Sequence, residues 1–367
     1  MSIEVIERIS HKYGANPDYV LAGGGNTSFK DENHLYIKGS GTSLATITKD
    51  GFVKMSREAL SNIWLKKYSL EQDKREAEVL ADMMGAKCPG EESKRPSVET
   101  LLHNLFVQPY VLHVHPTMVN GLTCSSEGKE RMEKMFPYAI WIEETEPGYT
   151  LAKKCRERIN EFEEKTGKRA NLLFLQNHGV FFAASGEEEM DELVNLVMSK
   201  FCEQIKQYPD MSFVESNVDV GAICKLLSEL SGEGSVVNFV LNKEVLRLSQ
   251  SLDEFSILLR PMTPDHIVYC KALPLFVEDL ISVKSAFEAF VAKNGYAPKI
   301  IFVKKIGMFA IGNSEKNAQV VSDVWLDAIK ISVYSQSFGG IRQMAPEMVD
   351  FIANWEVESY RSKVALK

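Results

Sequence analysis

The chain has 367 residues, of which 45% are apolar and 25% are charged, as in an ordinary globular protein. This length favours two domains over one. A net charge of −8 argues against an electrostatic nucleic-acid binder, and no apolar run reaches the roughly 18 to 20 residues that cross a bilayer. We therefore expect neither a nucleic acid nor a membrane as a partner.

The N-terminal sequence and the pattern of cysteines indicate the cellular compartment of the protein. The first ten residues mix charged and apolar side chains at helical spacing without an uninterrupted apolar core, so they do not predict a signal peptide. Six cysteines are scattered without a Cys-x-x-Cys pair, which fits reduced thiols better than a disulfide framework. We expect a cytoplasmic protein.

Residues 1–19 are predicted to form an amphipathic helix that ends near Gly14, and a run of three glycines, 23–25, follows it. Successive glycines free the backbone to fold around a small anion, although such a run is more often a tight turn. The run lacks the Gly-Lys-Ser/Thr ending of a P-loop. Side-chain donors come directly after it: Asn26, Thr27 and Ser28. We expect Asn26 and Thr27 to bind a substrate phosphate.

A second loop of small residues, 39–43, follows a predicted strand over residues 35–38 and contains Ser40 and Gly41. Its hydroxyls and amides resemble those of the glycine run. Two such loops close in sequence could cradle one phosphate, although neither proves it. Residues 56–87 are then predicted to be helical and largely on the surface.

A new helix is predicted to begin after Pro96. Ser97 is a candidate N-cap, which places Glu99 in the first turn, where the positive helix end favours an ionised carboxylate. Glu99 is then either a catalytic carboxylate or only a capping group, and this pattern leaves both open. We expect His103, one turn later, to pack or to hydrogen-bond rather than to bind a metal.

Residues 110–115 are rich in apolar β-formers and predict a buried strand that Pro116 ends. His113 and His115 lie two apart, so they project from one face and can chelate a single ion. Histidines that alternate on a strand can also be ordinary hydrogen-bonded residues. A catalytic zinc site usually has three protein ligands, so this interpretation requires a third.

His178 is the candidate for that third ligand. It lies in an Asn-His-Gly turn, 177–179, between two apolar segments that predict a hairpin over residues 171–184. The glycine beside it lets the backbone approach another chain segment closely.

The other elements are predicted from hydropathy and charge, and they divide the chain into domains 1–208 and 209–367 at Tyr208-Pro209-Asp210. They are helix and loop over residues 117–134, a strand over 137–142, and helices over 150–166 and 186–207.

Five motifs together resemble the class II aldolase/adducin family, in order and approximate spacing. They are Gly25-Asn26-Thr27-Ser28, Ser40-Gly41, Pro96-Ser-x-Glu99, His113-x-His115-Pro116 and Asn177-His178-Gly179. The resemblance covers roughly residues 1–207. The rest is similar to the continuation of the aldolase part in bifunctional rhamnulose-1-phosphate aldolase/alcohol dehydrogenase chains, with the dehydrogenase domain lacking.

The resemblance implies an α/β protein. Its first domain would have a layered αβα fold around a central, mainly antiparallel sheet, and a second α/β domain would follow. Members of the family commonly assemble as symmetric tetramers, so we expect a homo-oligomer, although the second domain could block or replace the contact between subunits.

The resemblance also implies roles for individual residues. His113, His115 and His178 match the zinc ligands, and Glu99 matches the catalytic carboxylate. One position departs from the family, because Val98 stands where a second serine often precedes the glutamate. The positions that match the phosphate-binding residues are Asn26, Ser40, Gly41 and Ser97. Some members use a proton-donating tyrosine of a neighbouring subunit, for which Tyr138 and Tyr149 are candidates by position.

The implied function is zinc-dependent cleavage of a ketose 1-phosphate of the rhamnulose or fuculose type. The products would be dihydroxyacetone phosphate and an aldehyde. Zinc, or another divalent transition metal, would stabilise an enediolate as a Lewis acid while Glu99 moves the proton. Two alternatives stay open: epimerisation, dehydration or decarboxylation of a sugar phosphate by the same site, and a non-catalytic scaffold of the adducin type.

The second half contains a possible copy of the hairpin. Residues 299–311 align with 171–183, so that Phe302 matches Phe174 and Gly307 matches Gly179. In this alignment Ile306 falls opposite His178. We therefore hypothesise that residues 211–367 are a degenerate repeat without a metal site, in which His266 is structural. The alternative is that such hairpins are common to all α/β proteins.

Overall fold

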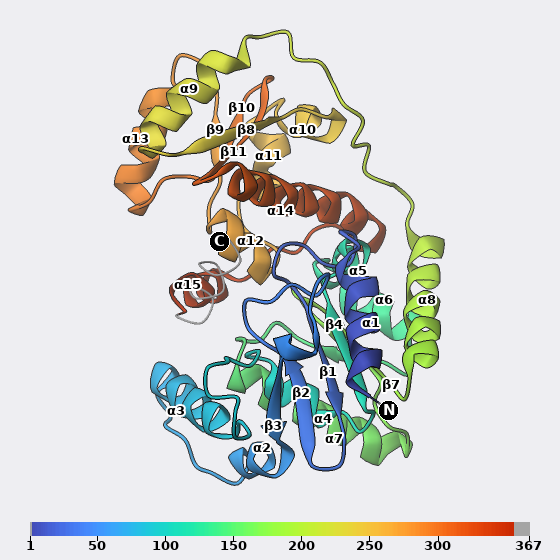
Figure 1. Ribbon diagram of the computed structural model, residues 1–367. Helices are drawn as coiled ribbons and strands as arrows, with labels where there is room; N and C mark the ends of the chain where they lie inside the picture. The colour runs from blue at the N-terminus through green and yellow to red at the C-terminus, as the bar shows by residue number, and fades with distance from the viewer. Residues whose placement is uncertain (1, 356–367) are drawn as a thin grey trace. The chain divides into compact units, whose positions relative to one another are not determined.

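The computed structural model describes residues 2–355. Within them the chain forms two compact units (Figure 1). The first holds the residues up to Val119 and Lys129–Gln204, and the second holds Asn120–Gly128 and the residues from Ile205 onwards.

This division differs from the predicted domains in two respects. The boundary follows Gln204 and not Tyr208, and Asn120–Gly128 belong to the second unit. Cys124 Sγ lies 3.5 Å from the carbonyl oxygen of Met262, and Ser125 pairs with Ile341 in an isolated bridge. A nine-residue segment that packs on residues so distant in sequence has no local signal.

The first unit is built on a seven-stranded sheet in the order β3-β2-β1-β4-β7-β6-β5. All neighbours are antiparallel except β5 and β6, which are parallel. The strands are β1 Asn26–Lys30, β2 His34–Lys38, β3 Phe52–Ser56, β4 Tyr110–Val114, β5 Ile140–Ile142, β6 Leu172–Leu175 and β7 Gly179–Ala184.

Helices cover both faces of this sheet, which makes three layers. Helices α1 and α8 pack on one face, against β1, β4 and β7. On the other face, apolar side chains of α2, α3, α4 and α7 share one buried core with the strands. The helices are α1 Ile3–Gly14, α2 Arg57–Ile63, α3 Gln72–Gly85, α4 Thr100–Leu105, α6 Gly128–Met135, α7 Tyr149–Thr166 and α8 Glu187–Gln204, and α5 Thr117–Thr123 continues into the second unit.

The second unit has its own four-stranded sheet in the order β8-β11-β10-β9. Helix α14 packs on one face, and α9 and α13 share a core with the other face. Its strands are β8 Val236–Val240, β9 Leu275–Val277, β10 Ile300–Val303 and β11 Gly307–Gly312. Its helices are α9 Val220–Ser231, α10 Lys243–Leu248, α11 Leu252–Phe255, α12 Pro264–Cys270, α13 Val283–Asn294, α14 Glu315–Tyr334 and α15 Pro346–Asn354.

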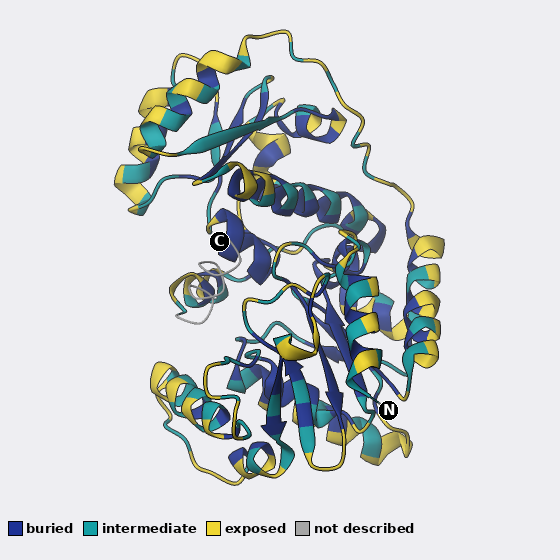
Figure 2. Cartoon of the chain, in the orientation of Figure 1, coloured by how far each residue is buried: buried dark blue, intermediate teal, exposed yellow. Residues whose placement is uncertain are grey.

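The predicted fold class is confirmed: a mainly antiparallel central sheet between helices, with a second α/β region. Figure 2 shows that the strands of the first unit are almost entirely buried, which matches the apolar sequences of β4 to β7, whereas β1 buries polar residues as well. Among the described residues, no helix has both the length and the apolar character that a membrane span requires.

Lys30, the last residue of β1, has a buried side chain. Its side chain is 3% exposed, and its ammonium nitrogen donates to the carbonyl oxygen of Gln108 at 2.8 Å. Burial, with a smaller contribution from Arg57, places the pKa of Lys30 well below its usual range. Lys30 is therefore a site where the native fold is destabilised at neutral pH.

We expect Lys30→Met to be more stable than the native chain at pH 7, by a margin that shrinks towards pH 10. Between its lowered native pKa and the unfolded pKa of about 10.4, Lys30 is protonated in the unfolded chain and neutral in the native chain, so native stability rises with pH by up to about 1.4 kcal/mol per unit. Urea unfolding at several pH values measures this, with exposed Lys74→Met as the control. A margin that does not change with pH would contradict the assignment.

Candidate metal centre

The first two histidines of the candidate site are held by strand β4, which lies between β1 and β7 in the sheet. His113 is fully buried and pairs across the strands with Asn26 and with Phe181, whose ring stacks on the imidazole at a centroid distance of 4.0 Å. His115 follows the end of the strand, and its amide donates to the carbonyl oxygen of Tyr19 at 3.0 Å. Both imidazoles leave the strand on the same side, as the alternation predicts.

The third histidine comes from the turn of the β6–β7 hairpin. Asn177 has φ of 57°, a left-handed conformation that asparagine tolerates better than most residues. A Cβ atom on Gly179 would lie 2.7 Å from Cδ2 of His115 and 2.6 Å from the carbonyl oxygen of Val114, so only glycine fits there. The hairpin therefore approaches β4 closely, and His178 joins the other two histidines.

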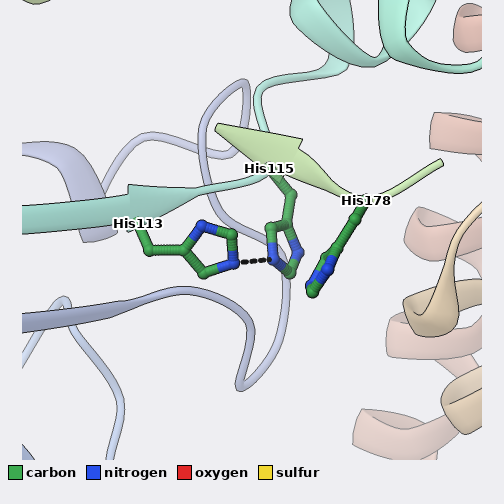
Figure 3. Close-up of side chains that lie close together, drawn as sticks. All are labelled: His113, His115 and His178. Atoms are coloured by element: carbon green, nitrogen blue, oxygen red, sulfur yellow. Dashed lines mark hydrogen bonds between the residues drawn. The ribbon is translucent and has the colours of Figure 1, made fainter. Parts of the chain in front are cut away.

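The three imidazoles point towards one another (Figure 3). Nε2 of His113 lies 3.0 Å from Nε2 of His115, and one ligand nitrogen from each histidine lies within 4.8 Å of the others. Nδ1 of His113 lies 3.0 Å from the carbonyl oxygen of Val180. This contact assigns the ring proton to Nδ1 and turns the lone pair of Nε2 towards the other histidines.

This donor set suits a zinc ion. Tetrahedral zinc–nitrogen bonds of about 2.0 to 2.1 Å place ligand nitrogens about 3.3 Å apart, close to the separation of the His113 and His115 nitrogens. Three imidazoles leave one coordination position for substrate or water, which is typical of catalytic rather than structural zinc. The same nitrogen ligands would also accept neighbouring divalent transition metals.

Glu99 brings a carboxylate to the same place. It is 6% exposed, and its Oε1 lies 3.4 Å from Nε2 of His113 and 3.8 Å from Nε2 of His178. Within the described part of the chain this oxygen accepts no hydrogen bond, whereas Oε2 accepts one from Asn26 Nδ2 at 2.5 Å. One carboxylate oxygen is thus anchored, and the other faces the space between the imidazoles.

The local structure around Glu99 differs from the predicted N-cap. Helix α4 begins at Thr100, so Glu99 rather than Ser97 is the N-cap residue. The Ser97 hydroxyl instead accepts a hydrogen bond from the Glu99 amide at 3.2 Å, in a turn just before the helix. The helix thus begins two residues later than predicted, and the carboxylate stays at the positive helix end.

A buried chain of hydrogen bonds extends from Glu99 away from the histidines. Nε2 of His103 hydrogen-bonds Oδ1 of Asn26, and Nδ1 of His103 lies 2.8 Å from Oγ of Ser28. Because Asn26 donates to Glu99 through Nδ2, its Oδ1 must accept from His103, and Ser28 must then donate to Nδ1. Complete burial lowers the pKa of His103 well below its usual value, so the ring is neutral and keeps this tautomer.

The sequence identified the members of this chain but not their connection. Asn26 was predicted to contact phosphate, yet its amide group is committed to Glu99 and His103. The available signals were the alternation of Asn26 and Ser28 on one strand face and the four-residue spacing of Glu99 and His103 on a helix.

The other predicted phosphate residues separate into two groups. Ser40, Gly41 and Ser97 lie in adjacent loops, since Gly39 bridges Pro96 and the Ser40 amide donates to Arg95 at 2.7 Å. Thr27 does not join them. Its hydroxyl is fully buried at 2.7 Å from Oγ of Ser10, on the opposite face of β1 from Asn26, so its predicted side-chain role is wrong.

Lys38 is a residue near these loops that the prediction missed. It ends β2 directly before the Ser40 loop, is 5% exposed, and donates to the carbonyl oxygens of Gly25 at 2.9 Å and Gly23 at 3.1 Å. The glycine run and the Ser40 loop are therefore tied together by one buried ammonium group. Its only sequence signal was a lysine at the end of an apolar strand.

The two candidate tyrosines pack against aromatic residues of the first unit. Tyr149 stacks on Trp64 at a centroid distance of 5.6 Å, and the ring of Tyr138 meets Phe136 edge-on at 6.3 Å. Their candidate role concerns the site of a neighbouring subunit, so it stays a prediction.

Comparison with known proteins agrees with this arrangement. Residues 6–199 match the model of the Class II Aldolase and Adducin N-terminal domain family. The chain belongs to this family. The resemblance inferred from the five motifs is thus confirmed, and the matched range includes all three histidines and Glu99.

Individual relatives of this family member are distant. The uncharacterized oxidoreductase YuxG of Bacillus subtilis (strain 168) is 22% identical over 418 aligned positions, which cover 99% of this chain and 58% of the relative. The chain thus spans little more than half the length of that protein.

Two solved structures are similar to the first half. The N-terminal class II aldolase domain of a conserved Thermoplasma acidophilum protein is 26% identical over 55% of this chain and 93% of that domain, with a TM-score of 0.45. An L-fuculose 1-phosphate aldolase is 18% identical over 55% of this chain and 85% of its own, with a TM-score of 0.37.

We expect the purified chain to bind one divalent metal ion and His178→Ala to bind it far more weakly. Loss of a direct ligand should exceed the roughly 10- to 100-fold effect of losing an outer-shell partner. Elemental analysis and competition with a chromogenic chelator measure this. His34→Ala, at the start of β2, is the matched control and should keep the metal; an unchanged affinity in His178→Ala would exclude His178 as a ligand.

Proposed function

We propose that the chain is a zinc-dependent class II aldolase that cleaves a ketose 1-phosphate of the rhamnulose or fuculose type. The products are dihydroxyacetone phosphate and an aldehyde. The observation that carries this proposal is the convergence of three imidazoles with an anchored carboxylate, whose second oxygen faces the space between them. Membership of the class II aldolase and adducin family supports it.

The proposed chemistry divides between the histidines and Glu99. When bound by His113, His115 and His178, zinc supplies Lewis-acid polarisation of a substrate oxygen. Glu99 moves the proton of the reacting carbon or hydroxyl through Oε1, a contribution that is typically worth about 100- to 10,000-fold. Asn26 holds Oε2 and so fixes the direction in which Oε1 points.

The phosphate group is assigned to the adjacent loops. Ser40, Gly41 and Ser97 supply hydroxyl and amide donors, and Gly41 has φ of 88°, which suits a loop that folds around an anion. Lys38 adds a buried amino group that hydrogen-bonds the glycine run and precedes the Ser40 loop in the chain. The amide of Asn26 hydrogen-bonds Glu99, so we do not assign it to the phosphate.

The Bacillus subtilis relative is called an oxidoreductase, but the match covers only 58% of that protein. Epimerisation, dehydration and decarboxylation would use the same imidazoles and carboxylate, so they are the alternatives that activity measurements must separate. A homo-oligomeric state and a cytoplasmic location stay predictions.

We expect the protein to condense dihydroxyacetone phosphate with L-lactaldehyde, and Glu99→Gln to lower this rate by at least about 100-fold while keeping the metal. The amide cannot accept the proton but occupies the same volume. Coupled detection of the ketose 1-phosphate and elemental analysis measure the two effects. Glu58→Gln, exposed on α2, is the control, and condensation at the native rate in Glu99→Gln would remove Glu99 from its role.

Removal of the metal provides a second check on the reaction. Dialysis against a chelator should abolish condensation, and added zinc should restore it. A chain that contains the metal but fails to condense these substrates would favour an epimerase, dehydratase or decarboxylase. A chain that binds no metal would favour a scaffold.

We expect His103→Phe to lower turnover by about 10- to 100-fold without loss of metal, because Asn26 would lose the donor that orients its amide. His103→Gln can still donate to Asn26 and should recover part of the rate. The pH profile of turnover should change in His103→Phe, since Glu99 would lose a fixed hydrogen bond. If the pH profiles of turnover in His103→Phe and His103→Gln were both identical to that of the native chain, His103 would have only a packing role.

A further inference from the structure

We infer that the second unit is a copy of the first in which the three metal-ligand positions are occupied by Phe239, Leu241 and Ile306. The chain would then contain two class II aldolase-type units but only one metal centre. The assignment of these positions rests on the proposed role of His113, His115 and His178, whereas the repeat itself rests on backbone geometry.

The first observation is the arrangement of strands. In the first unit, β4-β7-β6-β5 are neighbours with antiparallel, antiparallel and parallel pairings. In the second, β8-β11-β10-β9 are neighbours with the same sequence of pairings. The matched strands occur in the same chain order, and the last strand of each set leads into a long helix, α8 or α14.

The second observation is the register of the hairpins. Leu172 pairs with Phe182 in the first unit, and Ile300 pairs with Ala310 in the second. Both partners are shifted by the same 128 residues, and this offset also relates every other pair of the two hairpins.

The turns and the preceding helices repeat at the same offset. Asn177 and Lys305 are both non-glycine residues with positive φ, 57° and 61°. Helices α7 and α13 both end before a left-handed glycine, Gly167 and Gly295. Both hairpins therefore use a turn with the left-handed residue at the same position, although this position is lysine, which adopts that conformation rarely, in the second unit.

The neighbouring strand fixes the equivalents of the two paired histidines. Val114 pairs with Val180 in the first unit, and Val240 pairs with Met308 in the second. Strands β4 and β8 are therefore related by an offset of 126 residues. The offset places Phe239 at the position of His113 and Leu241 at the position of His115, and the hairpin offset places Ile306 at the position of His178.

Contacts of the glycine at the hairpin support these equivalences. A Cβ atom on Gly179 would lie 2.6 Å from the carbonyl oxygen of Val114 and 3.4 Å from the ring of His113. One on Gly307 would lie 3.0 Å from the carbonyl oxygen of Val240 and 2.8 Å from the ring of Phe239, which are the equivalent residues. Phe239 also packs on Phe309 at a centroid distance of 5.0 Å, as His113 packs on Phe181 at 4.0 Å. The close approach of glycine to a ring is thus kept in the second unit.

The substituted residues cannot bind a metal, because none of the three side chains has a lone pair to donate. The carboxylate position is altered as well. Four residues separate the end of α4 from β4, and four separate the end of α9 from β8. The 126-residue offset places Lys225 where the first unit has Glu99. Lys225 lies inside α9, whereas Glu99 precedes α4, and within the described residues the second sheet has no strand equivalent to β1. The second unit therefore keeps the four strands and the hairpin turn of the site, but neither its metal ligands nor its carboxylate.

The test restores the ligands. In a His178→Ala background, which leaves the first unit without tight metal binding, the full-length chain is given Phe239→His, Leu241→His and Ile306→His. The control carries Asn238→His, Val240→His and Ile306→His, which place two imidazoles on the opposite strand face. Cobalt(II) titration followed by visible absorption reports the number and symmetry of the sites, and circular dichroism reports folding.

We expect the in-register variant to bind about one cobalt ion with tetrahedral absorption, at least tenfold more tightly than the off-register control. A folded in-register variant that binds no better than the control would overturn the inference. Should that variant fail to fold, a crystal structure of the native chain decides: superposing the two units must place Phe239 on His113 and Ile306 on His178. A native chain without metal would refute the proposed function, but not the repeat in this superposition.

Discussion

The candidate site depends on one close backbone contact. Gly179 lies so near strand β4 that a Cβ atom would overlap the ring of His115 and the carbonyl oxygen of Val114. Only this approach brings His178, 63 residues beyond His115 in the sequence, to the paired histidines. Because the sheet fixes β4 and β7 as neighbours, it positions His113 directly and places His115 and His178, which lie just beyond these strands, beside it.

The second requirement is a polar network that has no access to water. Asn26, His103 and Ser28 are each less than 10% exposed, yet their side chains satisfy one another in a single direction that ends at Glu99. Burial that leaves hydrogen bonds unmade costs free energy, so such networks are stable only when complete. Complete pairing fixes one oxygen of Glu99 and directs the other.

Comparison of the two units shows that a few side chains on a shared backbone decide whether a metal site exists. The backbone registers of four strands agree, and the side chains at three positions decide whether an ion can bind. Phenylalanine, leucine and isoleucine pack in these places as readily as imidazoles do, since the surrounding core is apolar in both units. Function is therefore argued from the site and not from the fold.

The sequence by itself determined the periodic elements, the His-x-His strand, the hairpin that carries His178 and the family, because each has a local pattern or an ordered motif. Only the tertiary structure decided that Asn26 serves Glu99, that Thr27 faces Ser10 and that Lys38 ties two loops together. Residues 120–128 likewise joined the second unit without a local signal. The reason is physical: periodicity specifies which residues share a face, whereas hydrogen-bond partners depend on which distant segments the packing brings within 3 Å or so of each other.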